Sequence, residues 1–152
     1  MKNIKKISFL KFRPIQKKDL KELYDLLNQL SVMHLDLIDK VQAWDDFKSN
    51  NSTNSIVGVC NFGSKKNIIV AYGSIVIENK IRGEKAGHIE DVVVLNDVRG
   101  EDIGTKLVQK LLEIAKKYKC YRVSLFCKEH LKDFYKINGF EVNSVAMKKW
   151  IT

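Results

Sequence analysis

The sequence predicts a single α/β domain, residues 1–152, built on one mixed, mostly antiparallel sheet with helices on both faces. Helix-like and strand-like hydrophobic periods alternate along the chain, which is typical of this fold class. Polar and glycine turns separate three consecutive strand-like runs near the middle, as in an antiparallel meander. No repeat or linker divides the 152 residues, a length that can bury one hydrophobic core.

The first third of the chain contains one predicted strand and two predicted helices. The strand, residues 7–13, ends at Pro14, the only proline. Leucines at helical spacing predict a helix over residues 17–30, with Asp19 near its positive end. Apolar residues along one face predict a second helix over residues 35–48.

The rest of the chain contains the meander and a second group of alternating elements. Three strands are predicted over residues 55–61, 68–78 and 87–94, joined by polar turns. An amphipathic helix follows, marked by apolar residues from Leu107 to Tyr118. The elements predicted after it are a strand over residues 122–127, a short helix over 131–137 that ends at Gly139, and closing strands over 140–142 and 145–150.

Composition and charge limit the classes of function. The chain is 45% apolar and 30% charged, as soluble globular proteins are, and no apolar run approaches the roughly 20 residues of a membrane span. The basic residues 1–6 lead into no signal-peptide core, so we expect a cytoplasmic protein without a membrane partner. The net charge of +9 is scattered rather than gathered in one block, which is typical of a solvated surface and does not by itself decide between partners. From the sequence as a whole we expect no nucleic-acid partner.

Cysteine and histidine spacing predicts neither a disulfide framework nor a metal site. The three cysteines, Cys60, Cys120 and Cys127, are far apart and form no CxxC pair. No two of the three histidines have metal-ligand spacing, and His88, beside a predicted strand, is interpreted as a structural residue.

The segment most informative about chemistry is residues 87–104, where a strand rich in valine runs through a turn directly into a helix. Arg99, Gly100 and Gly104 lie at this turn. Glycines let backbone N–H groups approach a ligand closely, and a helix N-terminus offers unpaired donors and a positive dipole end. The turn is therefore suited to a pyrophosphate, although a plain glycine turn with Asp102 as helix N-cap fits the same residues.

Arg99-Gly100-Glu101-Asp102-Ile103-Gly104 resembles the signature of the GNAT acetyltransferase superfamily, Gln/Arg-x-x-Gly-x-Gly/Ala, with Asp102 in place of the middle glycine. The resemblance implies a GNAT-type fold and acetyl-CoA as co-substrate, with no metal. The residues that it implies for acetyl-CoA are Val92, Val93, Val94, Arg99, Gly100, Glu101, Asp102, Ile103, Gly104, Thr105 and Tyr135.

Four further motifs resemble the glucosamine 6-phosphate N-acetyltransferases within that superfamily. They are, in order, Gly87-His88-Ile89-Glu90-Asp91-Val92, Lys119-Cys120-Tyr121-Arg122-Val123, Phe134-Tyr135 and Asn138-Gly139-Phe140. This narrower resemblance implies acetylation of the amine of D-glucosamine 6-phosphate, for UDP-N-acetylglucosamine synthesis. It also implies a homodimer with active sites near the subunit boundary.

Candidate catalytic residues are two adjacent acids and a tyrosine. Glu90 and Asp91 would hold the sugar ammonium and accept its proton, but neighbours on a regular strand point to opposite faces. The resemblance implies a β-bulge there, which would change their directions. Tyr135 is the candidate general acid, because a phenol with a reference pKa of about 10 stays protonated at neutral pH. A core tyrosine is the alternative interpretation.

The resemblance places the acceptor sugar against Glu90, Asp91, Ser31 and the basic turn residues Lys80 and Arg82, the last two holding its phosphate. Two positions depart from the narrower family, because Phe126 and Trp150 stand where it has an aspartate and an arginine. Two alternatives stay open. They are a GNAT enzyme for another amine (a polyamine, an aminoglycoside or a protein amine), and a nucleic-acid-binding or adaptor domain without acetyl transfer.

Overall fold

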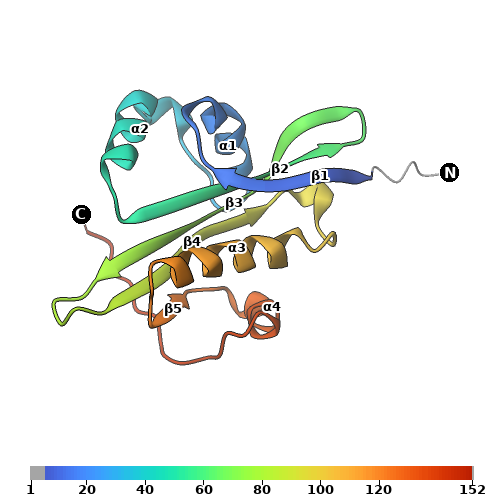
Figure 1. Cartoon of the computed structure of the whole chain (residues 1–152). Helices are drawn as coiled ribbons and strands as arrows, with labels where there is room; N and C mark the ends of the chain where they lie inside the picture. The colour runs from blue at the N-terminus through green and yellow to red at the C-terminus, as the bar shows by residue number, and fades with distance from the viewer. Residues whose placement is uncertain (1–5, 152) are drawn as a thin grey trace.

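Five strands form one sheet in the computed structural model, which describes residues 6–151 (Figure 1). The spatial order of the strands follows their order in the chain, with antiparallel pairs from β1 to β4 and a parallel pair between β4 and β5. The strands are β1 Ile7–Pro14, β2 Thr53–Phe62, β3 Lys65–Asn79, β4 Lys85–Val94 and β5 Arg122–Leu125. The predicted mixed, mostly antiparallel sheet is therefore confirmed.

Helices cover both faces of this sheet. Figure 1 shows α1 and α2 on one face and α3 and α4 on the other. Their bounds are α1 Leu20–Leu27, α2 Lys40–Ser49, α3 Ile103–Lys117 and α4 Lys132–Ile137, with short 3-10 turns η1 Lys17–Asp19, η2 Leu35–Leu37, η3 Asn96–Val98 and η4 Glu129–Leu131. The predicted second helix starts late, because Asp39 caps α2 by accepting hydrogen bonds from the backbone N–H groups of Val41 and Gln42.

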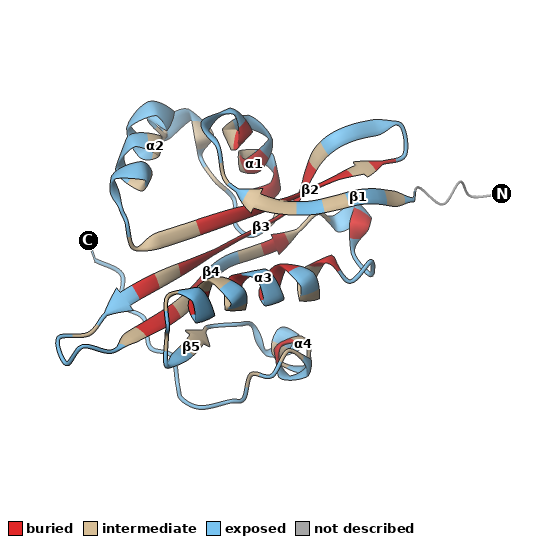
Figure 2. Ribbon diagram, in the orientation of Figure 1, coloured by how far each residue is buried: buried red, intermediate tan, exposed pale blue. Residues whose placement is uncertain are grey.

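Each face of the sheet has its own buried core (Figure 2). The larger core lies under α3, whose Leu107, Val108 and Leu111 are fully enclosed. The smaller core lies under α1, where Leu23 and Leu26 pack against the sheet around Tyr72 and Val93. The helices bury apolar residues along one side only, whereas the strands bury residues on both faces of the sheet. This is the pattern from which the sequence predicts the fold.

The prediction of two closing strands is wrong. Residues 140–151 form no strand, and β5 stays at the edge of the sheet, ending at Leu125 rather than at 127. Val145, Met147 and Trp150 are 88%, 96% and 80% exposed. A strand forms only beside another strand that exchanges backbone hydrogen bonds with it. The apolar residues of this tail do not by themselves provide such a neighbour. The tail therefore leaves a large apolar surface open.

Candidate active site

A β-bulge interrupts β4 at the two adjacent acids. Tyr72 of β3 lies opposite Val93 and Ser74 lies opposite Glu90, so β4 contains one extra residue between these pairs. Asp91 occupies this position with a φ of 53°, in the left-handed region that Asp and Asn tolerate better than most residues. The bulge that the family resemblance implies is thus present.

The bulge brings Glu90 and Asp91 to the same face of the sheet. Ile89 belongs to the core under α3, so Glu90, the next residue, points to the opposite face, toward α1. Burial raises the pKa of the Tyr72 phenol on the α1 face, and the Asp91 carboxylate adds to this increase, which places Asp91 near the same face. Partial burial raises the pKa of the Asp91 carboxyl, and the neighbouring Glu90 carboxylate raises it further. Two adjacent acids therefore share one local environment.

A polar cluster under these acids is not evident from the sequence. The hydroxyl of Tyr72 lies 3.0 Å from the Ser55 hydroxyl, and both side chains are buried. Ser74 donates a hydrogen bond of 3.4 Å to the backbone carbonyl of Glu90. These residues lie on β2 and β3, and only the pairing of the strands brings them under the bulge.

The sheet also opens between β4 and β5 next to the acids. The two strands pair in parallel from Ala86 opposite Arg122 to Ile89 opposite Leu125. Among residues 6–151, positions 90–94 of β4 have no ladder partner on the β5 side. Backbone N–H and C=O groups along this stretch are therefore available to a ligand with an extended, amide-containing arm.

The signature turn carries β4 into the N-terminus of α3. Gly100 has a φ of 90° and Asp102 a φ of 61°, so the two residues make the turn in conformations that favour glycine. Asp102 is the N-cap residue, but its side chain accepts no capping hydrogen bond. The first backbone N–H groups of α3, from Ile103 to Thr105, have no partner within the helix and are aimed at the turn.

Gly104 lies at a close approach between two helices, and its own backbone conformation does not call for glycine. A Cβ atom at this position would lie 3.2 Å from the Phe134 ring of α4. The contact holds α4, which carries Tyr135, against the start of α3. The last glycine of the signature therefore lies where the signature turn meets the helix that carries the candidate general acid.

Asp102 places a negative charge where the signature has glycine, so we expect Asp102→Asn to strengthen acetyl-CoA binding. Asparagine also tolerates the left-handed conformation, and the variant therefore changes the charge alone. Two like charges about 6 Å apart in water repel by roughly 0.7 kcal/mol, which corresponds to about a threefold change in Kd. Calorimetric titration with acetyl-CoA measures this change in Kd. The variant Glu113→Gln, further along α3, is the control for the change in net charge. An unchanged Kd would show that Asp102 points away from the pyrophosphate.

Tyr135 is buried in α4 but borders a cavity. Its ring meets Phe134 and Phe140 edge-on, with centroids 4.9 and 5.8 Å away. Burial raises the pKa of its phenol, and Cys127 adds to the increase. Its hydroxyl makes no hydrogen bond with any residue between 6 and 151, so it is available as a donor to a ligand.

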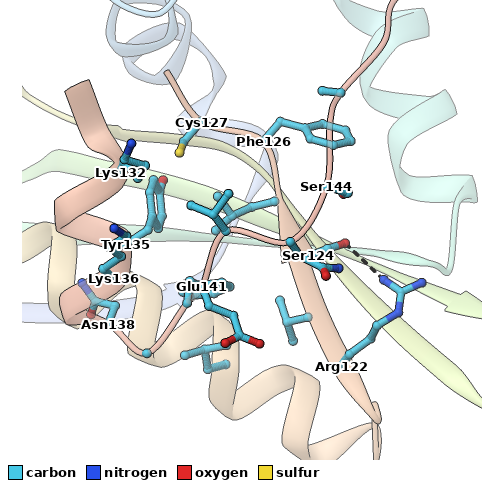
Figure 3. A pocket seen from close by; sticks show the side chains of 18 of the residues that line it. Arg122, Ser124, Phe126, Cys127, Lys132, Tyr135, Lys136, Asn138, Glu141 and Ser144 are labelled. Carbon is cyan, nitrogen blue, oxygen red and sulfur yellow. Dashed lines mark hydrogen bonds between the residues drawn. The ribbon is translucent and has the colours of Figure 1, made fainter. Parts of the chain in front are cut away.

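The cavity beside Tyr135 has a volume of about 740 Å³ and lies between β5, α4 and residues 138–146. Figure 3 shows the Tyr135 phenol directed toward Cys127, with Phe126 across the cavity. Phe126 also contacts His88, the strand neighbour of the acids, at a ring-centroid distance of 5.0 Å. Phe126 therefore lines the same cavity as Tyr135 and also contacts His88. No sequence motif singled out Cys127, which becomes relevant only through its position in this cavity.

The structure does not place Lys80 and Arg82 beside Glu90. Both lie in the turn before β4, and the strand from Lys85 to Glu90 alone spans about 17 Å at roughly 3.4 Å per residue. Lys80 pairs with Glu78 at 2.8 Å, and the Arg82 guanidinium pairs with Glu84 and lies over the Tyr121 ring. These basic residues form a separate cluster at the far end of the sheet.

Ser31 lies in the exposed segment after α1, on the acid-bearing face of the sheet. The preceding Gln29 accepts a hydrogen bond of 3.0 Å from the backbone N–H of Asn96, just after β4. This contact ties the end of α1 to the C-terminal end of β4. Gln29 is a positioning contact that the sequence alone did not indicate.

Within residues 6–151, no three side chains of His, Cys, Asp or Glu gather into a group that could hold a metal ion. In the same part of the chain, no helix has the length and apolar character needed to cross a membrane.

Comparison with known proteins agrees with this arrangement. Residues 19–140 match the acetyltransferase (GNAT) family. The chain is 31% identical over 145 residues to glucosamine 6-phosphate N-acetyltransferase 1 of Dictyostelium discoideum, covering 93% of this chain and 91% of that protein. It is 43% identical over 84 residues to glucosamine 6-phosphate N-acetyltransferase of Arabidopsis thaliana, covering 54% of this chain and 56% of that protein.

The crystal structure of glucosamine-6-phosphate N-acetyltransferase from Arabidopsis thaliana has the same fold. It superposes with a TM-score of 0.83 at 31% identity, over 95% of this chain and 100% of that chain. The family match includes the bulged strand, the signature turn and the helix with Tyr135. The chain therefore belongs to the acetyltransferase (GNAT) family.

Proposed function

We propose that this chain transfers the acetyl group of acetyl-CoA to the amine of D-glucosamine 6-phosphate, giving N-acetyl-D-glucosamine 6-phosphate. The observation that carries the proposal is the pair Glu90 and Asp91, which the bulge turns to one face beside an open strand edge. Two carboxylates on one face are suited to holding an ammonium group and accepting its proton. The Dictyostelium relative, 31% identical over 93% of this chain, supports the choice of acceptor.

Acetyl-CoA supplies the acetyl group as a reactive thioester. Glu90 and Asp91 hold the amine and take its proton, directly or through water, as the amine nitrogen bonds to the carbonyl carbon. The backbone N–H of Val92 donates to the carbonyl oxygen as negative charge develops on it. Tyr135 gives a proton to the sulfur when the carbon–sulfur bond breaks.

The residues present fit acetyl-CoA. Val92, Val93 and Val94 lie on the stretch of β4 that has no partner on the β5 side, where the amide arm would add as a strand. The proposed pyrophosphate site is formed by the turn and the first residues of α3, Arg99, Gly100, Glu101, Asp102, Ile103, Gly104 and Thr105. The left-handed turn and the unpaired helix N–H groups support this assignment.

The phosphate of the acceptor is the less direct part of the proposal. Lys80 and Arg82 stay the proposed phosphate ligands, with Ser31 nearer the sugar. The 17 Å or so between the start of β4 and Glu90 exceeds the span of one hexose phosphate. Lys80 and Arg82 would therefore serve the active site of a neighbouring subunit rather than their own.

We expect a much higher kcat/KM for glucosamine 6-phosphate than for glucosamine. Loss of one charge-assisted contact, about 1.5 to 3 kcal/mol, corresponds to roughly a ten- to over a hundredfold loss. A thiol-release assay with acetyl-CoA compares glucosamine 6-phosphate, glucosamine, spermidine and a lysine peptide. If spermidine or the peptide were the best acceptor, the amino-sugar assignment would be wrong and the acetyltransferase assignment would stand.

A GNAT enzyme for another amine is the second candidate function. The observation that favours it is Phe126, which replaces an acidic residue of the narrower family with an apolar ring at the cavity. This ring packs on His88 and leaves no carboxylate at that point of the acceptor site. The same panel of amines decides between the two candidates.

We propose that the chain forms a homodimer. The apolar residues of the C-terminal tail, Val142, Val145, Met147, Trp150 and Ile151, are all more than two-thirds exposed, as are Val32 and Leu37 between α1 and α2. Apolar side chains exposed in such number are typical of a surface that a partner covers. We expect light scattering at micromolar concentration to give twice the monomer mass of 17.5 kDa. The monomer mass itself would exclude the dimer.

We also propose a cytoplasmic location. Cys60, Cys120 and Cys127 are all unpaired thiols. Free cysteines are usual in reducing compartments, whereas secreted domains of this size tend to pair them.

A further inference from the structure

His88 lies between two strands and an aromatic ring, with both ring nitrogens in contact. Its Nδ1 is 3.1 Å from the Ser124 hydroxyl of β5, the residue directly opposite it in the parallel ladder. Its Nε2 is 3.1 Å from an Oε1 oxygen of Glu90, on the same face of β4. The ring also contacts Phe126 at 5.0 Å. Three neighbours therefore fix the imidazole in one orientation.

The chemistry of the neighbours assigns the proton on a neutral His88 ring. A carboxylate only accepts hydrogen bonds, so Nε2 carries the hydrogen and donates it to Glu90. Nδ1 is then the acceptor, and the Ser124 hydroxyl donates to it. The Ser124 oxygen in turn accepts a bond of 3.4 Å from Arg122. In this series of hydrogen bonds, each donor points along the path from Arg122 through Ser124 and His88 to Glu90.

Glu90 needs such a support because its own surroundings leave it free to move. Its side chain is half exposed, and the residue that follows it forms the bulge. A glutamate in such a place has several rotamers, and restricting them costs conformational entropy. The Nε2–H of His88 holds one carboxylate oxygen and leaves the second oxygen free for a ligand.

We propose that His88 is a positioning residue for the transfer reaction, anchored by Ser124 and Phe126 so that it holds the Glu90 carboxylate toward the acceptor amine. The inference rests on the proposed function, since Glu90 is its acceptor-binding acid. It also gives Phe126 a role, because the ring that replaces an acid of the narrower family packs on the histidine instead of binding sugar. His88 acts through Glu90 and does not touch the reacting atoms.

His88→Phe tests this, because phenylalanine keeps an aromatic ring against Phe126 and removes both hydrogen bonds. We expect about a ten- to a hundredfold lower kcat/KM for the amine, through a higher KM and a lower kcat, with the Kd of acetyl-CoA unchanged. His88→Gln keeps a donor near the Nε2 position and should restore most of the loss. His130→Phe, at an exposed histidine of η4, is the matched control and should behave like the wild type.

A double-mutant cycle separates positioning from a general loss of structure. If His88 acts only through Glu90, then His88→Phe has no further effect in a Glu90→Gln background. An equal loss in both backgrounds, or a His88→Phe variant as active as the wild type, would overturn the proposal. Thermal unfolding identifies a variant that has lost its fold, and His88→Gln then carries the test.

A spectroscopic measurement checks the contact independently of activity. Where the His88 ring is neutral, nitrogen NMR should show its hydrogen on Nε2, and Glu90→Gln should shift these resonances. A His88 ring with its hydrogen on Nδ1 alone would contradict the proposed direction of these hydrogen bonds. If another amine proves the better acceptor, only the proposed function fails, and the same variants are assayed with that amine.

Discussion

Tyr135→Phe should lower turnover by on the order of 10² to 10⁴ while leaving the Kd of acetyl-CoA nearly unchanged. The substitution removes only the hydroxyl, because the edge-on contacts of the ring with Phe134 and Phe140 remain. That hydroxyl borders the cavity and has no hydrogen-bond partner in the described chain, so its loss leaves no buried group unpaired. A large effect therefore reports proton donation rather than damaged packing.

Single-turnover thiol release and acetyl-CoA titration measure these two quantities. Tyr118→Phe is the matched control, since the Tyr118 hydroxyl only bonds Asn54, 3.4 Å away at the end of α3. Burial raises the pKa of Tyr135, so its phenol keeps its proton throughout neutral pH and the wild-type rate should not fall there through its ionisation. An unchanged turnover in Tyr135→Phe would show that Tyr135 is a core aromatic residue and not the general acid.

Local periodicity predicted most of this fold because it reports burial directly. The leucines of α3 are buried as their helical spacing indicates, and the apolar runs of β2 and β3 are buried continuously because helices cover both faces of the sheet. The prediction failed for residues 140–151, where closing strands were expected over 140–142 and 145–150. Periodicity describes the face that a segment would bury, but only a partner surface turns it into a strand, and that surface is not encoded locally.

The site was predictable where a motif fixes the backbone and unpredictable where tertiary pairing decides. The signature predicted a turn before α3, and in the structure Gly100 and Asp102 take left-handed conformations there. In contrast, strand periodicity sends Glu90 and Asp91 to opposite faces, and the bulge that the family resemblance implied depends on the register between β3 and β4. Proximity in sequence also suggested that Lys80 could serve Glu90, whereas an extended strand separates them.

Substitutions in the acid pair should lower kcat/KM for the amine to different extents. Glu90→Gln should lower kcat/KM for the amine by on the order of 10²- to 10³-fold, because it removes the carboxylate that holds the ammonium and accepts its proton. Asp91→Asn is the matched variant. Asparagine tolerates the φ of 53°, and the contact of Glu90 with His88 stays, so this variant should keep more activity.

The pH dependence of kcat follows from the coupling of the two acids. The Glu90 carboxylate helps to raise the pKa of Asp91, so replacing it with a neutral amide lowers that pKa. Asp91 then stays ionised to lower pH, and the acidic limb of the profile in Glu90→Gln should move to lower pH than in the wild type. An acidic limb at the same pH in both proteins would show that the two acids do not interact. A greater loss in Asp91→Asn than in Glu90→Gln would exchange their roles, making the bulge residue the one that holds the amine.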